Sequence, residues 1–314
     1  MDPNLLYWKS HGQSFVSRLK IWCNLLDPTS LFSSNVDIQK AQARVGRGGK
    51  LNEEDRHALN LALSSVHADS GAVLPMVFRP PAFLAVSAPL VVASFLPHSS
   101  VKAALFWQFL LQSYNAGFNH TNRNSSSEKG TKTSMRQLVL IAGTVSYSTC
   151  AGALPQIIIN RLNVRTVPLQ NFFRFILPVP LSACLAFFNV FTVRNEESEA
   201  GIKVFDSNGN TVGISKLAGE KAVRETALSR AALFGTTAAV PQLLVSLLQR
   251  TRPFQRGSLM VAPLRHMSVA LIFGLMIPVS FSLFPQLGKI KKENVEEELR
   301  AAAVDRHLFY HRGL

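Results

Sequence analysis

Cysteine is scarce in this chain, and its few copies are too far apart to form a pattern. The 314 residues include 3 cysteines, Cys23, Cys150 and Cys184, and no Cys-x-x-Cys pair. A disulfide framework and a zinc finger are therefore excluded. The histidines and acidic residues form no catalytic or metal-binding pattern either. We predict that the chain is not an enzyme, holds no metal and needs no cofactor.

A cleavable targeting signal is also lacking. The sequence begins Met1-Asp2-Pro3-Asn4, with no basic segment leading into an apolar stretch and no Arg-rich presequence. We therefore expect that no presequence is cleaved and that any targeting information is internal.

The chain has fewer acidic than basic residues, with 19 Asp and Glu against 33 Lys and Arg, which gives a formal net charge of +14. Such a balance fits either a nucleic-acid binder or a protein whose loops face an anionic membrane. Here the basic residues lie in short connectors between apolar runs, and they are not interleaved with aromatics on a binding module. We therefore predict a membrane surface, and no nucleic acid, as the partner.

Long apolar stretches are what the sequence does have. Several of them approach the roughly 20 residues that cross a bilayer, and charges are crowded between them. They lie near residues 82–97, 138–159, 175–193, 231–249 and 267–285. The pattern predicts an all-α, multi-pass helical membrane protein with about five spans in contact with the lipid bilayer.

The stretches divide the chain into three parts. Residues 1–80 are predicted to form a soluble helical domain, because Trp8, Phe15 and Trp22 recur at roughly helical spacing. Residues 81–287 are predicted to form the membrane bundle, and residues 288–314 a C-terminal tail.

Within the predicted bundle, residues 194–230 form a polar excursion. Apolar and polar residues alternate around 202–205, and the pair Asn208-Gly209 follows. An Asn-Gly pair between such runs predicts a small β-hairpin. The segment after it, from Lys216 to Ser229, is predicted to be helical.

Residues 103–122 form an ambiguous sixth helix with a polar stripe. Gln112, Asn115, Asn119 and Asn122 fall at i, i+3, i+7 and i+10, which is one face of a helix. Lipid would leave these amides without partners, so the stripe should face the bundle interior, a water-filled cavity or the interface. Two interpretations stay open. The amides fix helix packing, or they line a path that recognises a small zwitterion, since an amide both donates and accepts.

The block His67-Ala68-Asp69-Ser70-Gly71 is polar and turn-prone, and it lies just before the first span. Asp and Ser side chains bond to nearby backbone groups in turns. We interpret the block from its residues alone as a structural cap at the membrane boundary.

Several blocks in order resemble the sideroflexin family across essentially the whole chain. They are His67-Ala68-Asp69-Ser70-Gly71, Gln112-Ser113-Tyr114-Asn115-Ala116, Asn119-His120-Thr121-Asn122-Arg123, Gly201-Ile202-Lys203-Val204, Asp206-Ser207-Asn208-Gly209-Asn210, Leu283-Phe284-Pro285-Gln286 and Phe309-Tyr310-His311-Arg312-Gly313-Leu314. The resemblance implies a protein of the mitochondrial inner membrane. For typical members it also implies transport of serine and related amino acids. The candidate site residues are then the motif residues His67, Asp69, Ser70 and Gly71, and Asn189 beside the amide stripe as a path-lining residue.

The departures from the family pattern are as informative as the matches. Ala68 stands where the family has proline, and Leu154-Pro155-Gln156 replaces the usual Gly-Leu-Asn. After Asn189 the usual Asn-x-Pro pattern gives way to Val190-Phe191. These departures look most like a divergent vertebrate branch that is associated with assembly of respiratory complex I and with iron–sulfur homeostasis. The resemblance implies that role, with complex I subunits or assembly factors as partners. Transport of a small, serine-like amino acid is the alternative.

The side of each terminus depends on the number of spans. With five spans, loops 160–174 and 250–266 share a side with the N-terminus, and these loops carry arginines and no acid. The positive-inside rule then favours an N-terminal domain in the matrix and a C-terminus on the opposite side. With six spans, the same loops lie away from the N-terminal domain.

Overall fold

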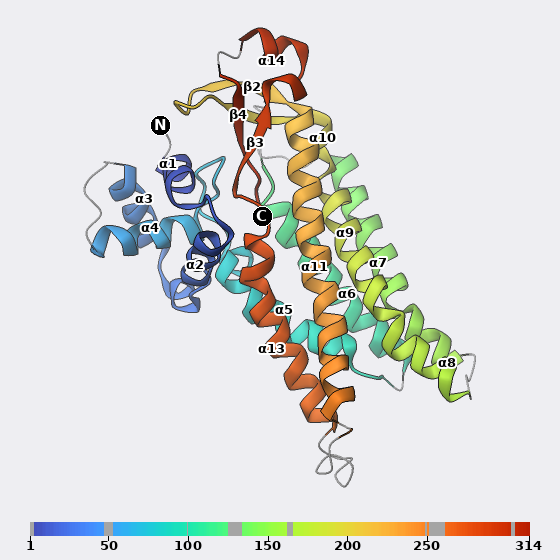
Figure 1. The fold of residues 1–314 in the computed structure, drawn as a ribbon. Helices are drawn as coiled ribbons and strands as arrows, with labels where there is room; N and C mark the ends of the chain where they lie inside the picture. The colour runs from blue at the N-terminus through green and yellow to red at the C-terminus, as the bar shows by residue number, and fades with distance from the viewer. Residues whose placement is uncertain are drawn as a thin grey trace.

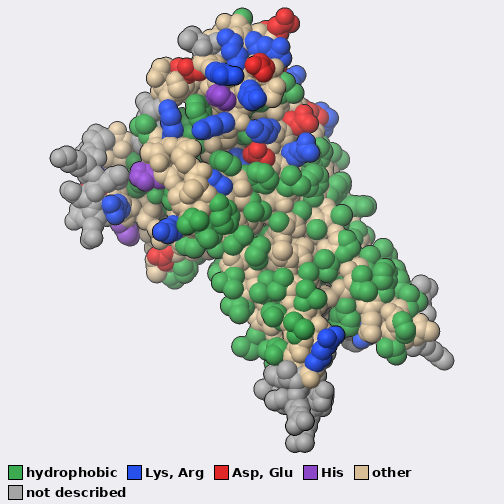
Figure 2. All heavy atoms as spheres, viewed as in Figure 1, with side chains coloured by type: hydrophobic (Ala, Val, Ile, Leu, Met, Phe, Trp, Pro, Cys, Tyr) green, Lys and Arg blue, Asp and Glu red, His purple; other side chains and the backbone are tan. Residues whose placement is uncertain are grey.

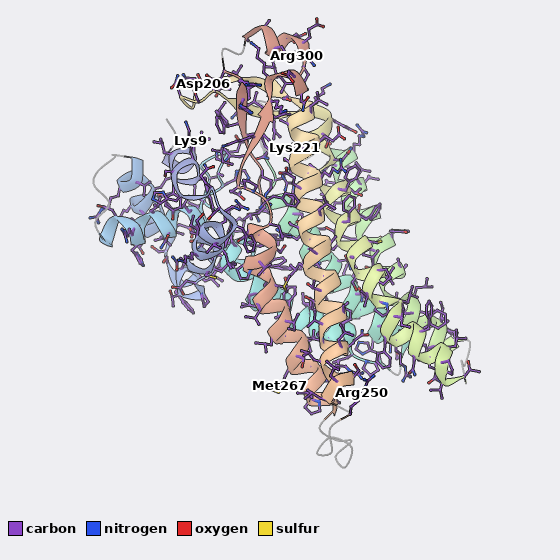
Figure 3. The ribbon with its side chains drawn as sticks, viewed as in Figure 1. Lys9, Asp206, Lys221, Arg250, Met267 and Arg300 are labelled. Carbon is purple, nitrogen blue, oxygen red and sulfur yellow. The ribbon has the colours of Figure 1, made fainter. Side chains whose placement is uncertain are left out.

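The computed structural model describes residues 3–46, 53–98, 100–124, 134–161, 166–248, 250, 261–302 and 305–314. A tilted helical bundle carries a helical domain and a small sheet at one end, where both chain termini lie (Figure 1). We call this end of the bundle the head-side end and the opposite one the distal end. Figure 3 places Lys9 and Asp206 at the head-side end, and Arg250 and Met267 at the distal end.

The N-terminal domain consists of short helices that begin at capping residues. Ser14 and Ser17 form a reciprocal capping box at the start of α2, and Asp27 accepts a hydrogen bond from the backbone N–H of Thr29. Apolar side chains such as Ile38 and Leu61 pack between the last two α-helices. The elements are α1 (Pro3–His11), α2 (Phe15–Leu25), η1 (Pro28–Phe32), α3 (Asn35–Gly46), α4 (Glu53–Ser65) and η2 (Met76–Phe78).

The bundle consists of helices that run back and forth between its two ends. They are α5 (Pro80–Phe95), α6 (Val101–Thr121), α7 (Met135–Arg161), α8 (Val167–Asn171), the π-helical turn η3 (Phe172–Ile176), α9 (Pro178–Val193), α11 (Lys216–Leu248) and α13 (Val261–Ser282). Among the described residues, 4 helical segments are long and apolar enough to cross a membrane, namely Met135–Arg161, Val167–Val193, Lys216–Leu248 and Ala262–Ser282. The apolar helix α5 is shorter, with 16 residues. The predicted class, a multi-pass helical membrane protein with a small hairpin, is confirmed.

The connection between α5 and α6 lies at the distal end, so α6 returns the chain to the head-side end. Gln156 and Asn160, near the distal end of α7, both donate to the carbonyl oxygen of His98 in this connection. With α6 counted, the helices make six passes, and the chain ends where it began (Figure 1). At the head-side end, the Arg18 guanidinium of α2 donates to the carbonyl oxygen of Ser282 at the end of α13.

Six passes remove the ground for placing the N-terminal domain in the matrix. The loops around residues 160–174 and 250–266 follow distal helix ends, away from the N-terminal domain. The arginines that the structure describes there therefore lie away from that domain, and not on its side as in the five-span count. They are Arg161, Arg174, Arg250 and Arg265. The five-span count left α6 out because its amides lower its hydropathy, although it runs the length of the other passes.

The predicted hairpin is present, and the tail joins it in one sheet. The strands β1 (Ile202–Phe205), β2 (Thr211–Ser215), β3 (Leu287–Lys291) and β4 (His307–His311) are antiparallel, in the order β2-β1-β4-β3. In the turn, Asp206 Oδ1 accepts from the backbone N–H of Asn208 and of Asn210, and Gly209 has φ +81°, which favours glycine. The short α10 (Asn195–Ala200), η5 (Lys292–Asn294) and α14 (Glu297–Ala302) complete this region.

The surface follows the same division as the chain. Figure 2 shows hydrophobic side chains over the bundle, while Lys, Arg, Asp and Glu gather at the head-side end. Leu243, Leu247, Leu271 and Leu275 on α11 and α13 are each more than half exposed. A continuous exposed apolar surface of this kind is what contact with lipid requires.

Candidate functional site

The amide stripe of α6 faces the inside of the bundle. Gln112, Asn115, Asn119 and Asn122 are all buried, with at most 7% of their surface exposed. Because α6 packs against α7 and α9, its polar face is turned away from lipid. The stripe serves two different purposes along the length of the helix.

In its head-side half, the stripe makes hydrogen bonds. The Asn119 amide donates to the Asn189 side-chain oxygen on α9 at 2.9 Å, and Asn189 in turn donates to the Gln112 carbonyl oxygen. Asn122 donates to the carbonyl oxygens of Phe78 and Phe118, which ties the end of α6 to the entry of α5. These amides fix the packing of helices, as the first interpretation of the stripe predicts.

In its distal half, the stripe lines a cavity of about 410 Å³. Gln108, Gln112 and Asn115 face this cavity. Its other walls come from α5 and the connection after it, and from α7, η3, α9, α11 and α13. The side-chain oxygen of Asn115 is buried and has no hydrogen-bond partner among the residues that the structure describes. A buried carbonyl oxygen in this state costs free energy unless a water or ligand donates to it. Of the predicted path-lining residues, Gln112 and Asn115 line the cavity.

Two arginines line the same cavity, and sequence analysis missed both. Arg174 comes from η3, and Arg265 comes from the first turns of α13. The Arg265 guanidinium lies 4.9 Å from the centre of the Phe175 ring, and its Nε is buried without a partner in the described chain. Gln108 was missed too, although it precedes Gln112 by one helical turn and so extends the same stripe.

The block around His67 lies at the head-side end, apart from the cavity. His67 Nδ1 accepts from the backbone N–H of Asp69 and of Ser70, and Nε2–H donates to the Arg123 carbonyl oxygen at 2.6 Å. Burial lowers the pKa of His67, which favours this neutral form. Gly71 has φ +69°, and Asp69 lies 3.5 Å from Lys203 of β1. The block joins the N-terminal domain to α6 and to the sheet.

A buried arginine joins the C-terminal segment to the bundle. Arg194, with no exposed surface, forms two hydrogen bonds to the Glu197 carboxylate and donates to the carbonyl oxygen of Arg312. Nearby, the Arg230 guanidinium lies 4.4 Å from the centre of the Phe281 ring. Burial lowers the pKa of Arg312 itself to about 10. Sequence analysis identified none of these arginines as buried, because the segments that cover them lie far away along the chain, although Glu197 is only three residues from Arg194.

Among the described residues, no group of three or more His, Cys, Asp or Glu side chains is placed to hold a metal ion. The chemistry that the arrangement can perform is therefore recognition by amides and guanidinium groups inside a bundle, rather than coordination by the described side chains.

Comparison with known proteins gives a consistent result along the whole chain. A family model described as "Sideroflexins" matches residues 5–314. Sideroflexin-4 of Danio rerio is 55% identical over 318 residues and covers all of both chains. Sideroflexin-4 of Homo sapiens is 36% identical over 322 residues, which is 100% of this chain and 93% of the relative. Sideroflexin-5 of Homo sapiens is 30% identical over 309 residues, 96% and 90% of the two chains. No solved structure matches.

Proposed function

The chain belongs to the sideroflexin family, and we propose that it supports the assembly of respiratory complex I in the mitochondrial inner membrane. The chain is 55% identical to a Sideroflexin-4 and 30% identical to a Sideroflexin-5. This agrees with the branch that its departures from the family pattern resemble, and that branch is associated with complex I.

The observation that carries the proposal is where the departures lie. Pro155 and Gln156, which replace the family's usual residues, line the cavity, and Gln156 Nε2 donates to the His98 carbonyl oxygen at 2.7 Å. Phe191 stands where the family pattern has a proline; its ring stacks on that of Phe187 within α9, which runs to Val193. The part of the bundle that would handle the family's amino acid is thus altered, which favours a role that does not need it.

A partner protein also needs a surface outside the membrane, and the N-terminal domain has one. Phe32 of η1 is 91% exposed, and Val16 and Val36 are each 58% exposed. Exposed apolar side chains mark an interaction site where they form a contiguous patch. We propose that this surface contacts complex I subunits or assembly factors. The link to iron–sulfur homeostasis is then a consequence of assembly and does not need an iron site in this chain.

The test is rescue of complex I in cells from which the gene has been deleted. Loss of the protein should lower the amount of assembled complex I on native gels, with complex IV as the control, and the intact chain should restore it. Phe32→Asp should fail to restore it. Ser182→Phe, which fills the cavity from α9, should restore it fully. Normal complex I without the chain would contradict the proposal.

A second function, transport of a small polar molecule such as an amino acid, is favoured by the cavity itself. Amides line it, and Pro89, Pro155, Pro241 and Pro278 lie inside four of the helices of the bundle. Prolines within spans are common in the helices that form transporter sites. Liposomes containing the purified chain should take up serine if the family's substrate is kept. Asn115→Ala should abolish uptake, and Asn122→Ala, away from the cavity, should leave it unchanged. Absence of uptake by the folded protein would contradict serine transport.

A further inference from the structure

The distal half of the bundle is basic and contains almost no acidic residue. Between residues 80 and 193 the sequence has 1 acidic residue, Glu128, and between 226 and 292 it has none. Glu128 belongs to the connection from α6 to α7, which leaves α6 at the head-side end. Arginines lie at or just beyond the distal ends of the helices, among them Arg161 and Arg250. Such a one-sided distribution attracts anions to the distal end and repels cations.

The cavity lies toward this end of the bundle. Arg174 and Arg265 line it, and no acidic side chain is among the described residues that form its walls. Neither arginine forms an ion pair with a described residue. Arg265 is half-buried, with its Nε wholly buried and without a hydrogen-bond partner in the described chain. A guanidinium group held this way is suited to receive a carboxylate, which it can bind through two parallel hydrogen bonds.

Deeper in the cavity, the groups are neutral and can both donate and accept. Gln108, Gln112 and Asn115 come from successive turns of α6, and the Asn115 oxygen has no hydrogen-bond donor within the described chain. This oxygen needs a donor such as a hydroxyl group. A volume of about 410 Å³ suits a small organic molecule.

An amino acid bound in this cavity would bury its ammonium group where no Asp or Glu side chain of the described wall could pair with it. Moving an ammonium group out of water without an acidic partner is costly, and two arginines nearby increase that cost. We propose that the cavity binds a small hydroxylated carboxylate anion in preference to a zwitterionic amino acid. The proposal rests on the second function above, uptake of a small solute, and it changes the class of that solute. It is independent of the role in complex I assembly.

Three probes of nearly equal size test the proposal. L-Serine carries a carboxylate and an ammonium group, L-glycerate has a hydroxyl in place of the ammonium group, and serinol has a hydroxymethyl group in place of the carboxylate. Each is titrated into the purified chain in neutral detergent at pH 7, and the rise in melting temperature is followed, since a ligand of the folded state stabilises it. L-Glycerate should bind at least about tenfold more tightly than L-serine, and serinol should give no shift.

Variants assign the effect to the arginines. Arg265→Gln should abolish the shift with L-glycerate, and Arg174→Gln, whose parent side chain is exposed and less important for folding, should weaken it about tenfold. Arg250→Gln is the matched control, because Arg250 is exposed at the same end and does not line the cavity. Its response should equal that of the unaltered chain.

Each other outcome would overturn the proposal. If L-serine bound as tightly as L-glycerate, the preference for an anion would be contradicted, while amino-acid uptake would still stand. No shift with any probe would sink both the anion proposal and uptake of such solutes, with complex I assembly untouched. A shift with phosphatidylglycerol that L-glycerate does not reproduce would assign the arginines to a lipid headgroup. Unchanged L-glycerate binding in both cavity variants would show that the arginines do not bind the anion.

Discussion

Asn119 of α6 and Asn189 of α9 form a side-chain hydrogen bond of 2.9 Å inside the bundle. Asn115 lies one helical turn from Asn119 toward the distal end, and its side chain lines the cavity. The amide stripe therefore changes its role between these two turns of α6. On the head-side it fastens helices, and on the distal side it presents polar groups to a solute-sized space.

We expect the Asn119–Asn189 pair to stabilise the fold only as a pair. Asn119→Leu removes the donor to the Asn189 side-chain oxygen, so the free energy of unfolding should fall by about 1 kcal/mol. The double variant Asn119→Leu with Asn189→Leu replaces both amides by apolar groups of similar shape, and its cost should be well below the sum of the two single variants. Thermal unfolding of the purified variants in detergent measures this. Additive losses would contradict the pairwise coupling.

Two neighbouring glutamates on α10 should differ sharply in their contribution to stability. Glu197 is buried against Arg194, so Glu197→Gln leaves a buried charge uncompensated and should cost about 3 kcal/mol or more. Glu199 forms a similar two-bond pair with Arg136, but both side chains are largely exposed. Glu199→Gln should therefore change the free energy of unfolding by less than about 1 kcal/mol. Similar losses in the two variants would mean that burial of Arg194 is not what matters.

The features that sequence alone could predict are those that depend on local pattern. The spans follow from apolar runs, the hairpin from Asn208-Gly209, and burial of the stripe from its helical spacing. Two predicted elements, the helix from Lys216 to Ser229 and the span near 231–249, are in fact one helix of 33 residues. No proline or glycine separates them, so the change in polarity marks the depth of the chain in the membrane and not a break in the helix.

What sequence could not predict depends on residues brought together from distant segments. The segment predicted as a C-terminal tail contributes to the sheet, since Tyr310 of β4 pairs with Val204 of β1, and neither segment shows its partner locally. The cavity combines Arg174 of η3, Arg265 of α13 and the amides of α6. Only Gln108 could have been found in advance, by extending the stripe one turn further.

Acid should weaken the attachment of the N-terminal domain through His67. Burial lowers the pKa of His67 in the folded protein below its ordinary value of 6.5, and the neutral ring donates to the Arg123 carbonyl oxygen. As the pH falls through 6.5, the unfolded chain binds a proton that the folded one resists. The stability due to the neutral ring is thus fully present above this pH and is lost below it.

Melting temperatures at pH 7.5 and pH 5.5 measure the effect of His67. His67→Gln keeps an N–H donor but cannot titrate, so its melting temperature should fall less between the two pH values than that of the unaltered chain. His57→Gln is the control, because His57 is exposed on α4 and should leave the pH dependence as it was. An equal drop in the unaltered chain and in His67→Gln would show that other groups cause the acid sensitivity.

The six passes of the bundle predict which residues face the same compartment. The accessible positions are Cys23 in the N-terminal domain, Lys291 on β3 and Arg250 at the distal end, all of them exposed. In a chain with Cys150 and Cys184 replaced by serine, Lys291→Cys and Arg250→Cys are introduced one at a time. A maleimide that cannot cross membranes is then added to sealed membranes that hold the chain in one orientation.

Cys23 and the cysteine at 291 should react from the same side, and the cysteine at 250 from the other, because α6 returns the chain to the head-side end. All should react after detergent is added, which controls for reactivity. Labelling of positions 23 and 291 from opposite sides would mean five crossings in the membrane, and it would place α6 at the interface.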